Sequence, residues 1–332
     1  MPGKKLKYIA RGLEGTAGTE VDATYLVKAP GAIKFDTMVE TPELEYATGI
    51  GGGNVEGATI SHDGTTITLS DYLFSHEDMV WLLNHALKAV PGAATTFAFP
   101  FYTTALNTLN TFTYEVNTSV SNASYTVTYC FVEKFGVHAD ADSNNGNVYT
   151  NATIRGRAAT AKAGTSSLGF LAAMEHATLN MCTLKLDAVG TAAGTASATN
   201  NVLKGFSFDV DTGNKPGDYA SGRSSKDFSV IDQGDFTIDT KVRLLLSATA
   251  VTRISNMRAG TPEVVQVAIV GSNSRVTKFN LPTIWTDIAE IGETDSNGLL
   301  MVEMTGQSAY SRTSTAQGAN INVTLSGSTT VT

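Results

Sequence analysis

The sequence predicts a mainly β protein built from two strand-rich halves, with a short α-helix flanking the first half. Three observations predict it. Apolar residues alternate with Thr, Ser and other polar residues over many short segments, as in half-buried strands. One segment alone shows clear helical spacing. A small, turn-prone stretch at 158–167 divides the 332 residues into halves of ordinary domain size, which predicts domains at 1–160, including an N-terminal arm 1–30, and at 161–332.

Composition limits the classes of function. The chain is 42% apolar and 16% charged, which describes a globular protein with few charges. Its 23 basic and 31 acidic residues give a net charge of −8, which argues against non-specific nucleic-acid binding. The basic cluster Lys4–Lys7 is interpreted as a solvated tail, as charge runs usually are, and the lack of an apolar stretch behind it argues against a signal peptide. No window approaches the roughly 18 apolar residues of a membrane span, so we expect a protein that is made in a cytoplasm and stays soluble until it assembles.

In the first half, Val55–Ser61 and Thr65–Ser70 flank Asp63-Gly64, a strong signal for a two-residue hairpin. The segment Tyr125–Val132 alternates as a strand. Its Cys130 is interpreted as a small reduced side chain, because two cysteines cannot form a disulfide framework. Alternation places Tyr125, Val127, Tyr129 and Phe131 on one face, and Thr126 and Thr128 on the other.

One helix is predicted after these first strands. Ser75 is suited to cap it, with Asp78 in the capping-box position three residues later. An apolar stripe at helical spacing then runs from Met79 to Leu87, and Pro91-Gly92 stops it. A helix of this length is not stable alone, so it must lie against a sheet.

The second half begins its clear strands with Phe206, Phe208 and Val210 opposite Ser207 and Asp209. The longest run is Asp235–Leu246, and Val264–Val270 and Leu299–Thr305 follow it. In Asp235–Leu246 the apolar side chains point one way, and the polar side chains point the other.

The two halves share a pattern that suggests a divergent repeat. Gly146–Arg157 and Gly234–Arg243 match in their alternation, and a polar loop precedes each, Asp140–Asn147 in the first half and Asp211–Asp227 in the second. Identity between the halves is too low to prove duplication, so both readings stay open. We expect the Asp211–Asp227 loop to be mobile in the free subunit, because a long polar loop cannot bury a core.

No arrangement of residues predicts catalysis, a cofactor or a bound metal. Asp140, Asp142 and Asn144 begin like a calcium loop, but the glycine falls one place late and Asn151 replaces the required Glu. Gly49–Gly53 lacks the Lys-Ser/Thr and the helix of a phosphate loop. The five histidines lack zinc-ligand spacing, and no Gly-x-Ser-x-Gly motif occurs.

The segment Gly12–Thr19, the Asp63-Gly64 hairpin, the helix Asp78–Leu87 and a strand pair around Gly298–Gln307 follow one another in an order that resembles the major tail tube proteins of long-tailed, siphovirus-like bacteriophages. The resemblance implies two tandem tail-tube-type β-sandwich or barrel domains, each with a small flanking helix. It implies rings of three chains with pseudo-sixfold symmetry, stacked into a tube. One departure is that the second half lacks an obvious counterpart of the helix, since Arg253–Arg258 is a poor substitute.

The same resemblance implies a virion location in the phage tail, synthesis in the cytoplasm of a host bacterium, and tape measure, terminator and distal tail proteins as partners. Double-stranded DNA would pass through the tube without specific binding, which an acidic or neutral lumen favours. Two alternatives remain open: a secreted β adhesin or carbohydrate-binding module, and a capsid or virion-surface (head) decoration protein of the same virus.

Two sets of candidate residues follow. The inter-ring loops would contain Asp140, Asp142, Asn144, Asn145, Asp211, Asn214, Lys215, Asp218, Tyr219 and Arg223. The lumen would be lined by the polar face of the long second-half strand, with Asp235, Thr237, Asp239, Lys241 and Arg243. Such a face must meet water or a polar neighbour, and the outer surface of the tube is the alternative position for it.

Overall fold

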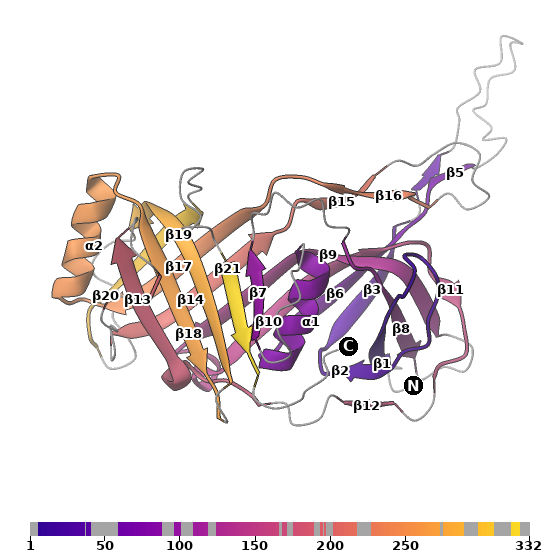
Figure 1. Cartoon of the computed structure of the whole chain (residues 1–332), viewed down its shortest axis with the longest axis horizontal. Coiled ribbons are helices and arrows are strands. Elements are labelled where there is room, and N and C mark those ends of the chain that lie inside the picture. Colours follow the sequence, from indigo (N-terminus) through magenta and orange to yellow (C-terminus); the bar gives the residue numbers. More distant parts are fainter. Residues whose placement is uncertain are drawn as a thin grey trace, which may run out of the picture.

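The computed structural model describes residues 6–36, 38–40, 59–87, 96–100, 109–118, 124–165, 168–170, 175–188, 193–194, 196, 202–217, 227–272, 275–288, 298–308 and 320–325. Within these residues the protein is mainly β with two α-helices, which confirms the predicted fold class at this level. The molecule is elongated, with the first half of the chain at one end and most of the second half at the other (Figure 1).

In the first half, strands both precede and follow helix α1 along the chain. Its elements are β1 (Leu6–Leu13), β2 (Tyr25–Val27), β3 (Gly31–Phe35), β4 (Met38–Glu40), β5 (Thr59–His62), β6 (Thr65–Leu73), α1 (His76–Ala86), β7 (Thr96–Pro100), β8 (Phe112–Thr118), β9 (Tyr125–Asp140), the 3-10 turn η1 (Asn144–Gly146), β10 (Val148–Gly156) and β11 (Thr160–Ala161).

The second half has a similar order around helix α2. Its elements are β12 (Gly169–Phe170), the 3-10 turn η2 (Leu179–Met181), β13 (Cys182–Ala188), β14 (Leu203–Asp211), β15 (Asn214–Gly217), β16 (Val230–Gln233), β17 (Thr237–Leu245), α2 (Ala248–Arg258), β18 (Glu263–Val270), β19 (Val276–Ile288), β20 (Met301–Ser308) and β21 (Asn320–Thr324).

One long antiparallel sheet runs through both halves. Its strand order is β3-β6-β10-β9-β14-β17-β20-β19, and the pairing of β9 with β14 joins the first half to the second. A second layer continues from this sheet in each half, because β9 and β19 each take part in both layers. These second layers are β12-β2-β1-β8-β9-β11 and β13-β18-β19-β21-β7. A continuous apolar cluster fills the space between the layers, and Phe208 of β14 lies 5.4 Å from Phe279 of β19 across it, ring centre to ring centre.

The pairing scheme of the first half recurs in the second. The ladder β1-β8-β9-β10-β6-β3 has the same connections as β13-β18-β19-β20-β17-β14. In both halves a nine-residue strand, β6 or β17, leads after two residues into an eleven-residue helix. Ser75 and Ser247 cap these helices by accepting hydrogen bonds from the backbone N–H of Asp78 and Ala250.

The prediction for helix α1 is confirmed, but the statement that the second half lacks a counterpart is wrong. Helix α2 occupies the equivalent place, at the far end of the molecule (Figure 1). Its apolar pattern is weak because, among its described side chains, only Ala250 is fully buried, whereas almost every side chain of α1 is buried. A buried ion pair holds each helix to a strand: Asp78 of α1 with Arg11 of β1, and Arg253 of α2 with Glu263 of β18.

The predicted two-residue hairpin at Asp63-Gly64 is also wrong. Strands β5 and β6, on either side of it, pair with β4 and β3 respectively. They therefore follow one another along the same side of a longer two-stranded ladder. The backbone N–H of Asp36 donates to the carbonyl of Gly64 at 2.9 Å, which keeps the two limbs in register across the break. Residues 55–58 of the expected Val55–Ser61 strand lie outside the described residues.

Strand β9 does not alternate as predicted. Tyr129 has φ 55°, and β8 and β9 shift register there, so that Phe112 faces Cys130 while Tyr114 faces Val127. Val127 and Cys130 therefore enter the main core, whereas Phe131 packs in a separate small cluster with Leu109 and Phe228. Alternation in β14 and β17 is confirmed by their burial.

The Glu14 carboxylate holds this irregular point. It accepts hydrogen bonds from the backbone N–H groups of Gly18 at 2.6 Å and Tyr129 at 2.8 Å, and from the hydroxyls of Thr111 at 2.6 Å and Thr113 at 3.0 Å. The glycine-rich segment Gly12–Thr19 thus serves as a turn around a buried carboxylate that joins β1, β8 and β9.

The expected loop Asp211–Asp227 is partly a strand. Residues Asn214–Gly217 form β15, which pairs with β16, and the described remainder packs against the first half. Phe228 contacts Phe131, and the Asp227 carboxylate accepts from the backbone N–H of Ala158 at 2.8 Å. The ladder β14-β15 with β16-β17 therefore repeats the ladder β3-β4 with β5-β6.

Candidate functional site

The outward side of the long sheet is a continuous polar surface, here called the polar face. It is formed by alternate side chains of the eight strands and by residues at the strand ends. Its charged members include Lys34, Asp36, Asp71, Glu133, Lys134, Asp140, Asp142, Asp209, Asp211, Asp239, Lys241, Arg243 and Glu303 together with Arg155. Strand geometry produces this surface, because the alternate residues of β14 and β17, such as Phe208 and Val242, point into the core.

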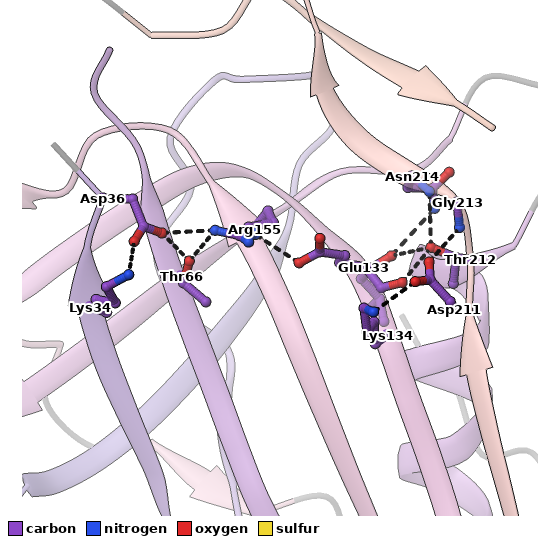
Figure 2. A network of polar contacts seen from close by, with 11 residues as sticks. Lys34, Asp36, Thr66, Glu133, Lys134, Arg155, Asp211, Thr212, Gly213 and Asn214 are labelled. Atoms are coloured by element: carbon purple, nitrogen blue, oxygen red, sulfur yellow. Dashed lines mark hydrogen bonds and ion pairs between the residues drawn. The ribbon is translucent and has the colours of Figure 1, made fainter. Parts of the chain in front are cut away.

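A bulge at the centre of the polar face directs two adjacent charges in different directions. Strand β9 carries one extra residue opposite Thr153 and Ile154, and Glu133 and Lys134 lie at that point. Figure 2 shows Glu133 turned toward Arg155 and Lys134 turned toward Asp211. The N–O distances are 2.7 Å and 2.8 Å. Lys134 and Asp211 therefore form an ion pair across the joint between the two halves.

The first-half side of the polar face is an ordered chain of charges. Asp36 accepts from Lys34 and Arg155, both at 2.9 Å, and from the hydroxyl of Thr66 (Figure 2). Partial burial alone would raise the pKa of Asp36, but the hydrogen bonds from Thr66 and Lys34 and the charge of Arg155 hold that pKa below its usual value. The Asp36 carboxylate is therefore ionised, and the neighbouring cations balance its negative charge.

The second-half side has the same character. Arg243 of β17 pairs with Asp140 and lies 3.8 Å from both Asp142 and Glu303. Lys241 pairs with Glu303 at 3.0 Å. Burial alone would raise the pKa of Asp211, but the hydrogen bonds from Lys134 and from the backbone N–H of Gly213 lower it. Each Lys and Arg of the polar face thus has a carboxylate partner, and the carboxylates outnumber the cations.

The candidate lumen residues fall together on this surface. Thr237, Asp239 and Lys241 are exposed on β17, Arg243 is half-buried, and Asp235 is exposed just before the strand. Sequence reasoning missed the partners supplied by other strands, above all Glu133, Arg155 and Glu303. The adjacent charges Glu133-Lys134 inside an alternating strand are the one signal that could have indicated the bulge.

The candidate inter-ring residues are divided between the two ends of the polar face. Asp140 ends β9 and lies opposite Gly205, while Asp211 lies opposite Lys134 six residues away along the same strand. Strand geometry separates these ends by about 20 Å. Asp142, Asn144 and Asn145 belong to the turn after β9, where Asn145 has φ 57°.

The remaining inter-ring candidates differ in accessibility. Lys215 is exposed on β15, but Asn214 is buried and donates to the carbonyls of Ala86 at 3.0 Å and Val132 at 3.3 Å. The Asn214 side chain therefore fastens the second half to the end of α1. Asp218, Tyr219 and Arg223 lie outside the described residues.

Among the described residues, no cluster of three or more His, Cys, Asp or Glu side chains could hold a metal ion. Neither of the two helices in the described ranges has the length and apolar character needed to cross a membrane.

The polar face is an extended surface of paired charges with an acidic excess. A comparison with models of known protein families finds no match for this chain, and a search of curated proteins finds no relative of it.

Proposed function

We propose that this protein is a tail tube subunit of a long-tailed bacteriophage, with two tandem tail-tube-type β-sandwich domains. Three chains form a pseudo-sixfold ring, and stacked rings form the conduit through which the genome is delivered. The subunit is made in the cytoplasm of the host bacterium and resides in the virion tail, in contact with tape measure, terminator and distal tail proteins.

The observation that carries the proposal is the joint between β9 and β14. It connects two units with the same pairing scheme by two different edges, so it is a head-to-tail contact. Contacts of this kind generate rings or helical filaments when they repeat, whereas a contact that uses the same patch twice stops at two units. A chain that contains one such joint is suited to continue it with further copies.

The polar face supports a role as a channel wall. Cations that would hold phosphate groups are already paired with carboxylates, as in Lys134 with Asp211 and Arg155 with Glu133. The remaining acidic excess repels a polyanion across a water-filled bore. DNA passes such a wall without stopping, which is the reverse of what a DNA-binding surface does.

Electron microscopy of the purified, concentrated protein tests the proposal. We expect hollow tubes of stacked rings, and rotational averaging of end-on views should give six similar units from three chains. Six separate chains per ring would contradict the two-domain arrangement. A protein that remains a monomer or a closed trimer at every concentration would contradict the tube and favour a decoration protein or an adhesin.

A further inference from the structure

The two helices occupy equivalent places, and residues at the same distance from their capping serines correspond. The contacts of each helix with its own half confirm this alignment. Trp81 of α1 packs on Phe112, the first residue of β8, with 4.6 Å between ring centres. Its counterpart Arg253 of α2 pairs with Glu263, the first residue of β18. Each helix therefore turns the same face toward its own half.

The opposite face of α1 is covered by the second half of the chain. His76 forms a hydrogen bond with the Thr277 hydroxyl of β19 at 2.7 Å, and Glu77 forms an ion pair with Arg275 at 3.1 Å. Strand β21 also contacts α1 and runs beside it (Figure 1). The side chains of this face are at most 6% exposed, and they belong to His76, Met79, Val80, Leu83 and Leu87.

The same face of α2, here called the outer face of α2, is open to solvent. Its residues are the counterparts of the five covered residues of α1, and all are exposed: Ala248, Val251, Thr252, Ser255 and Ala259. Val251 is 56% exposed, whereas its counterpart Met79 is 1% exposed. None of the five carries a charge. One uncharged helix face is thus uncovered at the end of the molecule.

The first half contains the counterpart of the strand that contacts α1. Strand β11 pairs with β9 as β21 pairs with β19. The pairs Phe112-Cys130 and Glu263-Thr283 lie at the same distance from the bulges in β9 and β19. Equal steps farther along these ladders give two matching rows, which are Val116-Tyr125-Ala161 and Val267-Phe279-Ile321.

These matching positions differ in burial as the helices do. Phe279 and Ile321 are buried, whereas Tyr125 is half-buried and Ala161 is exposed. Phe35 of β3 lies edge-on to Tyr125, with 5.1 Å between ring centres, and is 49% exposed. We call Phe35, Tyr125 and Ala161 the outer patch. It lies on the side of the long sheet opposite to the polar face, because the neighbours of Phe35 along β3 belong to that face.

We propose that the outer face of α2 of one copy packs on the outer patch of a second copy of this chain. This inference rests on the ring assembly proposed above and names a surface that joins neighbouring chains. The partner is a second copy because one chain carries both surfaces at opposite ends (Figure 1), and because α1 and β21 already join the equivalent surfaces inside the chain. The contact is head-to-tail, as ring formation requires. It removes Val251 and the two aromatic rings from water.

Site-directed cross-linking in the full chain tests the contact. The double variant Thr252→Cys, Ala161→Cys places one thiol on each surface, and a short bismaleimide bridges the roughly 10 Å between packed elements. We expect covalent species up to a trimer, because α2 and β11 lie too far apart to be joined within one molecule (Figure 1). An equimolar mixture of the two single variants should give a covalent dimer only.

Two controls accompany the cross-linking. The pair Thr252→Cys, Lys34→Cys moves one thiol to the polar face, on the other side of β3, and should give no covalent oligomer. The wild-type chain shows whether its own thiols react, since Cys130 is buried and Cys182 is partly buried.

A buried charge gives a second measurement that needs no cross-linker. Val251→Asp should raise the protein concentration required for assembly at least about tenfold, because a carboxylate would be buried against the outer patch without a partner. Phe35→Asp should have the same effect from the other side of the contact. The control Val270→Asp changes a residue that is 45% exposed and outside both surfaces, so it should assemble like the wild type. Light scattering measures assembly, and circular dichroism checks the fold of each variant.

The outcomes separate this inference from the proposed function. Tubes that form without the cross-link between Thr252 and Ala161, or with equal cross-linking in the Lys34 control, would overturn the contact and leave the tube standing. Assembly of Val251→Asp at the wild-type concentration would do the same. A chain that forms neither tubes nor cross-links would overturn both. Cross-linked chains that never form tubes would support the contact and contradict the proposed function.

Discussion

Replacement of Glu14 by Ala should lower the stability of the free subunit by about 3–5 kcal/mol. The carboxylate accepts four hydrogen bonds, and each bond to a charged group contributes about 1.5–3 kcal/mol, without simple additivity. The hydroxyls of Thr111 and Thr113 can rotate toward other acceptors. The backbone N–H groups of Gly18 and Tyr129 cannot, so the loss of these two bonds sets the expected range. Glu14→Gln keeps one acceptor oxygen and should cost about 1–3 kcal/mol.

Urea unfolding at a concentration below assembly measures the effect, with Trp81 in the first half and Trp285 in the second as fluorescent reporters. Trp81 lies 4.6 Å from Phe112 of β8, ring centre to ring centre, and so reports on the strand that Glu14 fastens. The control is Glu20→Gln, because Glu20 is exposed and its ion pair with Lys162 should contribute less than about 1 kcal/mol. An Ala variant within about 1 kcal/mol of wild type, with an unchanged slope against urea, would refute the role assigned to Glu14.

Three further predictions follow from other parts of the molecule. The double variant Asp235→Lys, Asp239→Lys should assemble normally but eject DNA more slowly and with a stronger salt dependence. The control Glu20→Lys, Asp22→Lys, away from the polar face, should leave the ejection rate unchanged. An unchanged ejection rate in the first variant would exclude the polar face as the channel wall. Burial lowers the pKa of His76 to about 4 and of His85 to about 3, so both side chains stay neutral in the native state at pH values where the unfolded chain binds protons. Stability should therefore fall as the pH drops below about 6.5, by up to about 1.4 kcal/mol per pH unit for each histidine. His85→Leu should remove one such contribution from the urea midpoints between about pH 4 and 6.5, and the same dependence of the midpoint on pH in variant and wild type would be the contrary result. Arg253→Met leaves the Glu263 carboxylate buried without its cation and should cost about 2–3 kcal/mol in thermal unfolding, against less than about 0.5 kcal/mol for the exposed Arg258→Met at the end of the same helix; equal losses would show that the ion pair does not anchor α2.

Local patterns in the sequence predict the elements whose environment is simple. Helix α1 follows from Ser75 and its apolar stripe, and the two faces of β14 and β17 follow from alternation, because each of these elements packs one side against a single core. The long sheet could not be predicted in the same way, since the β9-β14 joint links residues about 70 positions apart and leaves no periodic trace.

The errors have specific physical causes. Asp63-Gly64 favours a hairpin turn locally, but the longer ladder between β3-β4 and β5-β6 offers more backbone hydrogen bonds than a tight turn at that point. Helix α2 has too few apolar side chains to show a stripe, because its anchor is the buried Glu263, which binds Arg253, Asn256 and Trp285. The bend at Tyr129 depends on Glu14, more than a hundred residues earlier, so no window around β9 could reveal it.

The covalent link between the two halves has a kinetic consequence for assembly. The β9-β14 joint forms within one molecule, so its partners meet at the high effective concentration set by the chain between them and not at the concentration of the protein in the cell. In the proposed ring, three chains then need only two encounters in solution before the ring closes on itself, where six separate units would need five. Every partial ring contains whole pairs, so an intermediate with an odd number of units cannot accumulate. The order of events follows: the internal joint is complete before the first collision between chains.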